Sequence, residues 1–362
     1  MKRIFLLSMA LAAALASAQV NSEKARSLLA RGMAKKPVVN IRAIICQRAD
    51  YNSSVMQQVK VEMSRDGKIH QLVLAPISRQ GLESVDDLHY VRSYSPDDRL
   101  LIVQPSLKQD PRDIAFQMNL VDRNYSVNIA RRETIAGRPA VVVEATPKNK
   151  GLETRCYAID EKTGFVLRLE TCRPGKAPML HFETKMVEYP SQIDGDCFKI
   201  DSKWTQTRTY DEREIVERGE KVPDLPFTPV LPQKLPLGFA IQEMEADSAS
   251  SLPSLAVRLT DGLAKATVYQ WPTKGVKRLP APGGTLVRDA GAIRLLISGD
   301  VPDSVKKQLI EAFVNKLSKA TDLSAECFMS WVSELQESLL ALPLDRDLNI
   351  NVMYIEVEPT SL

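Results

Sequence analysis

Histidine, aromatic residues and catalytic motifs are scarce in this chain. Its 362 residues include three histidines and 6% aromatic residues. No dinucleotide fingerprint, phosphate loop or Gly-x-Ser-x-Gly elbow occurs. The histidines, His70, His89 and His181, lack the grouped Cys and His partners that zinc sites usually show. We therefore expect a binding protein with no catalytic residues, no metal site and no cofactor.

An excess of charge of either sign is also absent. The chain has 48 Lys and Arg against 45 Asp and Glu, and without Lys2 and Arg3 the basic total is 46. A net charge this close to zero creates no overall field that would attract nucleic acid or anionic lipid. We therefore expect no nucleic-acid partner.

The first eighteen residues have the pattern of a secretory signal peptide. Lys2 and Arg3 precede an apolar run over residues 4–15, and residues 16–18 read Ala-Ser-Ala, a small-x-small cleavage site. The run is shorter than the roughly 20 residues that a transmembrane helix needs. No cysteine follows the cleavage site to carry a lipid. We expect a mature protein that works outside the cytoplasm and carries no lipid anchor.

The remaining chain is long enough for more than one core. After a helix over residues 21–33, period-2 alternation predicts an antiparallel sheet domain over residues 19–218, with one further short helix at 110–120. Residues 219–236 contain five prolines and are interpreted as a linker.

Four strands are clearest, at residues 139–146, 152–159, 165–172 and 179–188, with turn residues between them. If the middle hairpin closes across Ile159 and Phe165, alternation places most of the large apolar residues on one face and leaves the other face polar. A sheet with one apolar face must cover it with helices, a second sheet or a ligand.

The predicted apolar face is a candidate ligand surface. The simpler alternative is that these residues form part of the hydrophobic core. The two interpretations are compatible if one end of the face is core and the other end lines a ligand site. Its members are Tyr157, Ile159, Phe165, Leu167, Leu169, Phe182 and Met186.

Five cysteines in an oxidising compartment leave one thiol unpaired. In the hairpin register above, Cys172 lies roughly 13 Å along the strand from the position opposite Cys156, too far for a bridge unless a bulge shifts the register. The alternatives are Cys156 with Cys172 or Cys172 with Cys197. Cys46 or Cys327 is then the expected free thiol.

Beyond the linker, residues 237–320 are predicted to form a smaller α+β domain. Strands are expected at 239–246, 254–260, 263–271, 284–288 and 292–298, and Pro302 opens a helix with an apolar stripe. Residues 321–362 are predicted to add a helix and a strand that is apolar on both sides. We expect this extension to pack into the second sheet or across a homodimer contact.

Five segments in order resemble the RseB/MucB family of periplasmic regulators. They are the run from Arg131 to Lys148, the hairpin from Cys156 to Arg168, the Leu-Pro-Leu-Gly-Phe segment at 235–239, the Asp-Gly-Leu hairpin at 261–269 and Gly-Asp-Val-Pro at 299–302. The resemblance implies an α+β protein. Its first domain would be a half-open antiparallel β-barrel like that of the lipoprotein carriers LolA and LolB, followed by the smaller α+β domain.

Two functions follow from this resemblance. The first is a non-enzymatic regulator that binds the periplasmic part of a membrane-bound anti-sigma factor and senses lipid or envelope stress. The second is a periplasmic lipid or lipoprotein carrier, favoured by the apolar face. The second domain argues against the carrier function, because a protein that only transports lipid does not need it.

Overall fold

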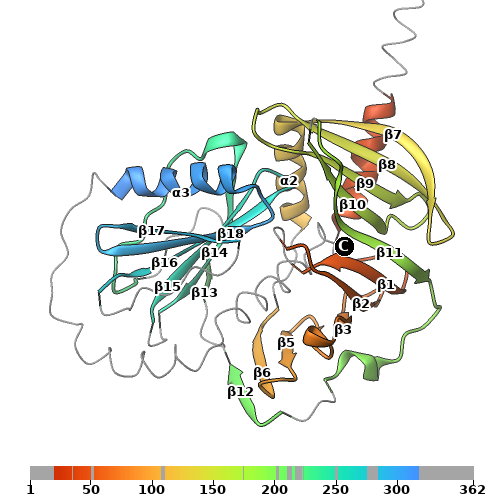
Figure 1. Cartoon of the computed structure of the whole chain (residues 1–362), viewed down its shortest axis with the longest axis horizontal. Coiled ribbons are helices and arrows are strands. Elements are labelled where there is room, and N and C mark those ends of the chain that lie inside the picture. Colours follow the sequence, from red (N-terminus) through yellow and green to blue (C-terminus); the bar gives the residue numbers. More distant parts are fainter. Residues whose placement is uncertain are drawn as a thin grey trace, which may run out of the picture.

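The computed structural model contains two separate sheets with helices packed on them (Figure 1). One sheet has twelve strands and the other has six. The structure describes residues 20–34, 36–49, 53–106, 111–173, 175–200, 204–209, 214–216, 222, 224–248, 252–274 and 284–317. The predicted signal peptide and the predicted extension over residues 321–362 lie outside this part of the chain.

The first sheet is an antiparallel meander with one parallel edge. Its order is β12-β6-β5-β4-β3-β2-β1-β11-β10-β9-β8-β7, and β12 runs parallel to β6. Both ends of this order are free edges, so the sheet is open and curled and does not close into a barrel. Its strands are β1 (Ile41–Arg48), β2 (Met56–Met63), β3 (Ile69–Ala75), β4 (Glu83–Asp86), β5 (Tyr90–Ser95), β6 (Leu100–Pro105), β7 (Tyr125–Ile135), β8 (Arg138–Pro147), β9 (Thr154–Asp160), β10 (Val166–Cys172), β11 (Met179–Glu188) and β12 (Gln206–Thr209).

Strands β8–β10 bury apolar side chains on both faces, so the prediction that one of their faces is polar is wrong. One cluster joins β1–β3 to β8–β10 through side chains such as Val61, Ile69, Val142 and Leu167. These strands are not neighbours in the sheet, and their side chains meet because the sheet curls. We call this cluster the inner core. Its residues pack inside the curl of the sheet.

The opposite face of β7–β11 is covered by helices. The N-terminal helix over residues 20–32 and α2 (Pro111–Asn124) pack there on Tyr157, Ile159 and Phe182. We call this cluster the outer core. The amphipathic spacing of α2 buries Met118 and Val121 in it. The two helices predicted from the sequence, 21–33 and 110–120, are therefore both present.

The hairpin of β9 and β10 has a different register from the one predicted. Ile159 pairs with Val166, and the register shifts between Val166 and Arg168. A bulge of this kind adds one residue to a strand and reverses which face the next side chains occupy. Phe165 and Leu167 consequently join the inner core, whereas Tyr157, Ile159 and Leu169 join the outer core.

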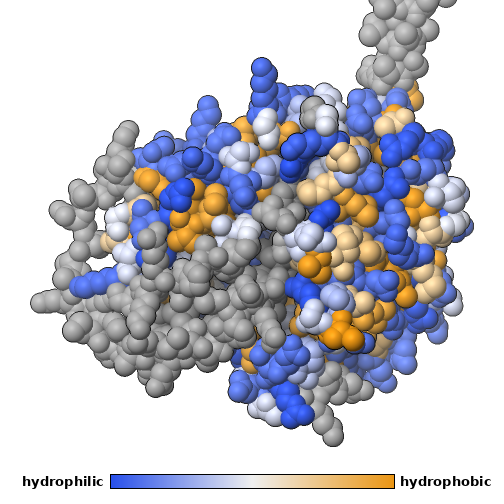
Figure 2. All heavy atoms as spheres, viewed as in Figure 1, coloured by the Kyte–Doolittle hydropathy of each residue, from blue (hydrophilic) through white to orange (hydrophobic). Residues whose placement is uncertain are grey.

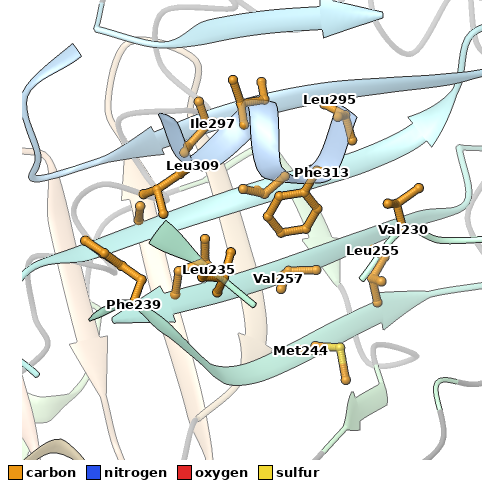
Figure 3. Packing of buried hydrophobic residues seen from close by; sticks show 14 of the residues in the cluster. Val230, Leu235, Phe239, Met244, Leu255, Val257, Leu295, Ile297, Leu309 and Phe313 are labelled. Atoms are coloured by element: carbon orange, nitrogen blue, oxygen red, sulfur yellow. The ribbon is translucent and has the colours of Figure 1, made fainter. Parts of the chain in front are cut away.

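The second sheet has the order β13-β14-β15-β16-β18-β17, and α3 packs on one of its faces (Figure 1). Leu309 and Phe313 of α3 contact Val257, Leu295 and Ile297 of the strands, as the close-up shows (Figure 3). The five strands and the helix predicted here are all present. The elements are β13 (Glu214–Val216), β14 (Ala240–Asp247), β15 (Ser254–Thr260), β16 (Lys265–Pro272), β17 (Leu286–Ala290), β18 (Ile293–Gly299) and α3 (Asp303–Leu317).

The proline-rich stretch predicted as a linker contributes to the second core. Phe227, Val230 and Leu235 are buried there, and Gln270 holds the backbone of Val230 through two side-chain hydrogen bonds of 2.8 and 2.9 Å. Strand β13 also pairs with β14, although residues 214–216 were predicted to belong to the first domain. The prolines therefore do not keep this stretch away from the second core.

Candidate binding pocket and the junction between the sheets

A hairpin of the second sheet inserts into the core of the first. The turn after β15 carries Leu263, which is fully buried and belongs to the outer core with Val121 and Tyr125. A Cβ atom on Gly262 would lie 2.7 Å from the Val121 backbone nitrogen, and the φ angle of Gly262 is +109°. Only glycine suits both the close approach and this backbone conformation.

Polar side chains of the first sheet secure this turn. Asn124, the last residue of α2, donates to the carbonyl oxygens of Gly238 and Asp261 at 3.0 and 2.8 Å. The hydroxyl of Tyr125 donates to Asp261 Oδ2 at 2.6 Å. Asp261 Oδ1 accepts from the N–H groups of Leu263 and Ala264, which closes the turn.

A second contact joins the same hairpin to the start of α3. Arg155 of β9 donates to the Leu263 carbonyl at 3.1 Å, and to Asp300 through Oδ2 and the backbone carbonyl, both at 2.9 Å. Asp300 Oδ1 in turn accepts from the N–H of Lys265. Every one of these groups is paired, as burial requires. The two sheets are therefore joined by matched contacts that rigidify the junction.

Burial shifts the titration of the junction groups. It raises the pKa of the Asp261 carboxyl above its ordinary value, although the Tyr125 hydrogen bond and the Arg155 charge oppose this shift. It also raises the pKa of the Tyr125 hydroxyl well above its usual range. Burial alone would lower the pKa of Arg155, but the facing Asp300 carboxylate raises it well above the ordinary value. The guanidinium therefore stays charged.

An apolar pocket opens at the end of the N-terminal helix, at the edge of the inner core. Apolar side chains from β1, β2, β3 and the β9–β10 turn form its wall, and two cations, Arg31 and Lys36, stand among its lining residues. The pocket has a volume of about 90 Å³, which is below the roughly 300–1,000 Å³ range of drug-sized ligand sites. Its apolar lining residues include Val38, Ile41, Met63, Ile69, Phe165 and Val166.

The helix and the turn meet at two glycines. A Cβ on Gly32 would lie 2.9 Å from Val166 Cγ2, so the helix packs directly on β10 at this point. Gly164 has a φ of +80° and contacts Arg31, whose guanidinium donates to the Lys162 carbonyl at 3.0 Å. These contacts fix the rim of the pocket.

Asp160 holds the turn that presents Phe165 to the pocket. Its carboxylate accepts from the N–H groups of Lys162 and Thr163 at 2.9 Å, and from Arg138 and the Tyr189 hydroxyl at 2.8 and 2.9 Å. Burial alone would raise the pKa of Asp160, but the hydrogen bonds from Arg138, Thr163 and Tyr189 lower it below its ordinary value.

The seven residues predicted as a ligand face do not lie together. Tyr157, Ile159, Leu169 and Phe182 are in the outer core beneath the helices, and Phe165 and Leu167 are in the inner core. Met186 is 44% exposed. Of the seven, only Phe165 lines the pocket.

The remaining pocket residues come from the early strands. Strands β1 and β2 carry Ile41 and Met63, whose apolar alternation is visible in the sequence. The sequence does not indicate that these strands curl over to meet Phe165. Apolar residues are also exposed in the region of β1, β2 and β3 on the face shown in Figure 2. Exposed large apolar side chains elsewhere on the molecule include Val55, Ile77 and Tyr90.

The bulge that shifts the hairpin also brings two cysteines together. Cys156 pairs with Glu170 and Cys172 with Thr154, and the two sulfur atoms are 3.6 Å apart. Both side chains pack against the inner core. Cys197 lies with Glu62 on the other face of β2, because alternation turns Glu62 away from Val61 and Met63.

One segment of the chain matches a known protein family. Residues 57–200 match the family model of the MucB/RseB N-terminal domain. Over these residues the chain is similar to the MucB/RseB family. The family match covers the first sheet from β2 to η2 (Gly195–Phe198). A search of curated proteins finds no match.

Solved MucB structures share the fold well beyond the matched domain. The crystal structure of MucB aligns with a TM-score of 0.55 at 17% identity over 80% of this chain and 98% of MucB. MucB in complex with MucA(peri) aligns with a TM-score of 0.52 at 16% identity, covering 79% of this chain and 96% of that one. The Pseudomonas aeruginosa MucA/MucB complex gives 0.53 at 15% identity with the same coverage. Across the described residues, no helix has the length and apolarity to span a membrane.

Proposed function

We propose that this protein is a non-enzymatic regulator that binds the periplasmic segment of a membrane-bound anti-sigma factor. The observation that carries this proposal is the fold shared with MucB in complex with MucA(peri), over 79% of this chain. The alignment extends far past the family domain at residues 57–200, so both sheets take part in the likeness.

The junction supports a partner surface that spans both sheets. Leu263, Asn124 and Arg155 hold the second sheet against the first, and a rigid pair of sheets can present one preformed surface. We further propose that the chain is secreted through the signal peptide at residues 1–18. Its two structural units would then be the first sheet with its helices, from the N-terminal helix to β12, and the second sheet from β13 to α3.

Binding to the anti-sigma factor encoded in the same genome tests this function. The purified mature protein should form a one-to-one complex with the isolated periplasmic segment of that factor in titration calorimetry. Because the net charge is near zero, the affinity should change only modestly with salt. Absence of binding by a correctly folded protein would count against the proposal.

A second candidate, lipid or acyl-chain binding, rests on the pocket beside the N-terminal helix. Its wall is apolar, and Arg31 and Lys36 at its edge suit an anionic head group. This site would let the protein sense envelope lipid in addition to binding its partner. The pocket volume of about 90 Å³ favours insertion of the end of a single acyl chain.

Substituting two valines in turn distinguishes lipid binding in the pocket from nonspecific binding to exposed apolar surface. Val38 lines the pocket and Val55 does not, although both are exposed, at 54% and 44%. We expect Val38→Trp to block the pocket and reduce the acyl species that co-purify in native mass spectrometry, whereas Val55→Trp leaves them unchanged. Equal loss in both variants, or empty wild-type protein, would argue against this candidate.

A further inference from the structure

Three potential metal ligands meet on the face of the first sheet opposite the inner core. Glu62 of β2 and His70 of β3 are directly paired across the two strands. Cys197 comes from the short helix η2, far along the chain, which packs over these strands. One donor atom from each residue lies within 4.8 Å of the others. Glu62 and His70 are buried and Cys197 is half-buried.

His70 is oriented as metal-bound histidines are. Its Nε2 atom is 3.0 Å from Glu83 Oε1, and its Nδ1 atom has no hydrogen-bond partner. The side chain is only 8% exposed, so water does not readily satisfy that nitrogen. A carboxylate on one ring nitrogen typically fixes the tautomer so that the other nitrogen can bind metal.

The spacing of the donor atoms fits a tetrahedral ion. Two ligand atoms bound to tetrahedral zinc at roughly 2.0–2.3 Å are about 3.3–3.6 Å apart. His70 Nδ1 and Glu62 Oε2 are 3.5 Å apart. The Cys197 sulfur needs to move inward by only about 1 Å from the 4.8 Å limit, which a side-chain rotation provides.

We propose that Glu62, His70 and Cys197 bind a zinc ion, with water as the fourth ligand. One thiolate, one imidazole and one carboxylate form a donor set that zinc accepts. The site was not expected from the sequence, because Cys197 is far along the chain from Glu62 and His70 and reaches them only through the packing of η2 on the sheet.

Two cationic side chains already contact Glu62, and one of them can move away when a metal ion binds. Arg42 holds Glu62 Oε1 at 2.9 Å, and Lys60 Nζ lies 2.7 Å from Oε2, the oxygen that faces the histidine. The Lys60 side chain is 37% exposed, so it can turn to solvent when an ion takes its place. Burial alone would raise the pKa of Glu62, but Lys60 and Arg42 lower it, so the carboxylate is already ionised.

The Cys197 thiol must lose its proton to bind zinc. Burial, with a further contribution from the Glu62 charge, raises the pKa of Cys197 to about 11. Zinc binding therefore displaces the thiol proton. The bound ion would tether η2 to β2 and β3, next to the apolar contacts of Phe198 with Val85 and Leu101. Zinc would thus fix η2 against the first sheet.

Cobalt substitution tests the site directly. Reduced mature protein titrated with Co²⁺ should show thiolate-to-metal charge transfer and the strong visible bands of tetrahedral coordination, and Zn²⁺ should displace both. Cys197→Ser should lose these bands. Cys46→Ser is the matched control and should keep them, because Cys46 lies on β1 outside the cluster. Wild-type protein without the bands, or Cys197→Ser with them, would overturn the proposal.

Two further variants separate a metal site from a structural cluster. Glu83→Gln keeps a partner for His70 but weakens it, and should reduce zinc affinity about 10–100-fold. Lys60→Met removes the competing cation and should tighten zinc binding. If the three side chains only stabilise the fold and do not bind zinc, neither change should alter the zinc affinity of the protein. That result would also overturn the proposal.

Discussion

Replacing Leu263 with alanine tests whether the hairpin fastens the two sheets together. Leu263 is fully buried between α2 and the first sheet. Leu→Ala at such sites costs about 2–5 kcal/mol, depending on how far the surroundings collapse into the cavity. Collapse is restricted here because Gly262 already sits against the α2 backbone near Val121. We therefore expect a loss in the upper half of that range.

The assay is equilibrium unfolding in urea, followed by circular dichroism and tryptophan fluorescence. The wild-type sheets should unfold together, and Leu263→Ala should lower the midpoint and separate the two signals. Leu286→Ala is the control, because Leu286 is only partly buried on the second core, away from the junction. A Leu263→Ala loss of less than about 1 kcal/mol would refute the reasoning, because a true core truncation costs more.

Three other predictions address the junction, the turn and the cysteines. Arg155→Met should destabilise the protein by about 1–3 kcal/mol in urea unfolding, because it removes the donor of three hydrogen bonds at the junction and leaves the buried Leu263 carbonyl without that donor; a change within experimental error would contradict this. The lowered pKa of Asp160 contributes stability that is present above pH 3.8, its ordinary value, and is lost as the pH falls through the folded-state value. Asp160→Asn should therefore flatten the acid limb of a stability–pH curve, and an unchanged limb would exclude this role. Under oxidising conditions Cys156 and Cys172 should form a disulfide, detected as a linked peptide in a non-reduced digest; a linked Cys172–Cys197 peptide in its place would contradict the structure.

Local pattern predicted the elements of this fold well. Alternation located β8 to β11 to within two residues, and the Asp261-Gly262 dipeptide marked the turn between β15 and β16. Apolar spacing after Pro302 identified α3. These signals succeed because each depends on side chains close together in the chain.

The arrangement of side chains around the candidate sites could not be predicted in the same way. One bulge between Val166 and Arg168 moved Phe165 and Leu167 to the other face from Leu169. The bulge also brought Cys172 to Cys156. Neither the bulge nor the curl of the sheet has a clear local signature, because both depend on how distant strands pack.

The burial of Leu263 in the first core could not be predicted either, because it too depends on the packing of distant segments. From the sequence it is a hairpin residue followed by alternating apolar positions, and nothing marks it as a member of the first core. The junction depends on three separate segments that meet only in the folded protein: the end of α2, β9 and the β15–β16 turn.

Calorimetric titration with the periplasmic segment of the anti-sigma factor from the same genome tests the central claim most directly. The account predicts one-to-one binding by wild-type protein. It also predicts clearly weaker binding by Leu263→Ala under conditions where that variant remains folded, because the variant loosens the junction that aligns the two sheets. No binding by the folded wild-type protein would contradict the proposed function, and equal binding by both proteins would contradict a surface that spans the two sheets.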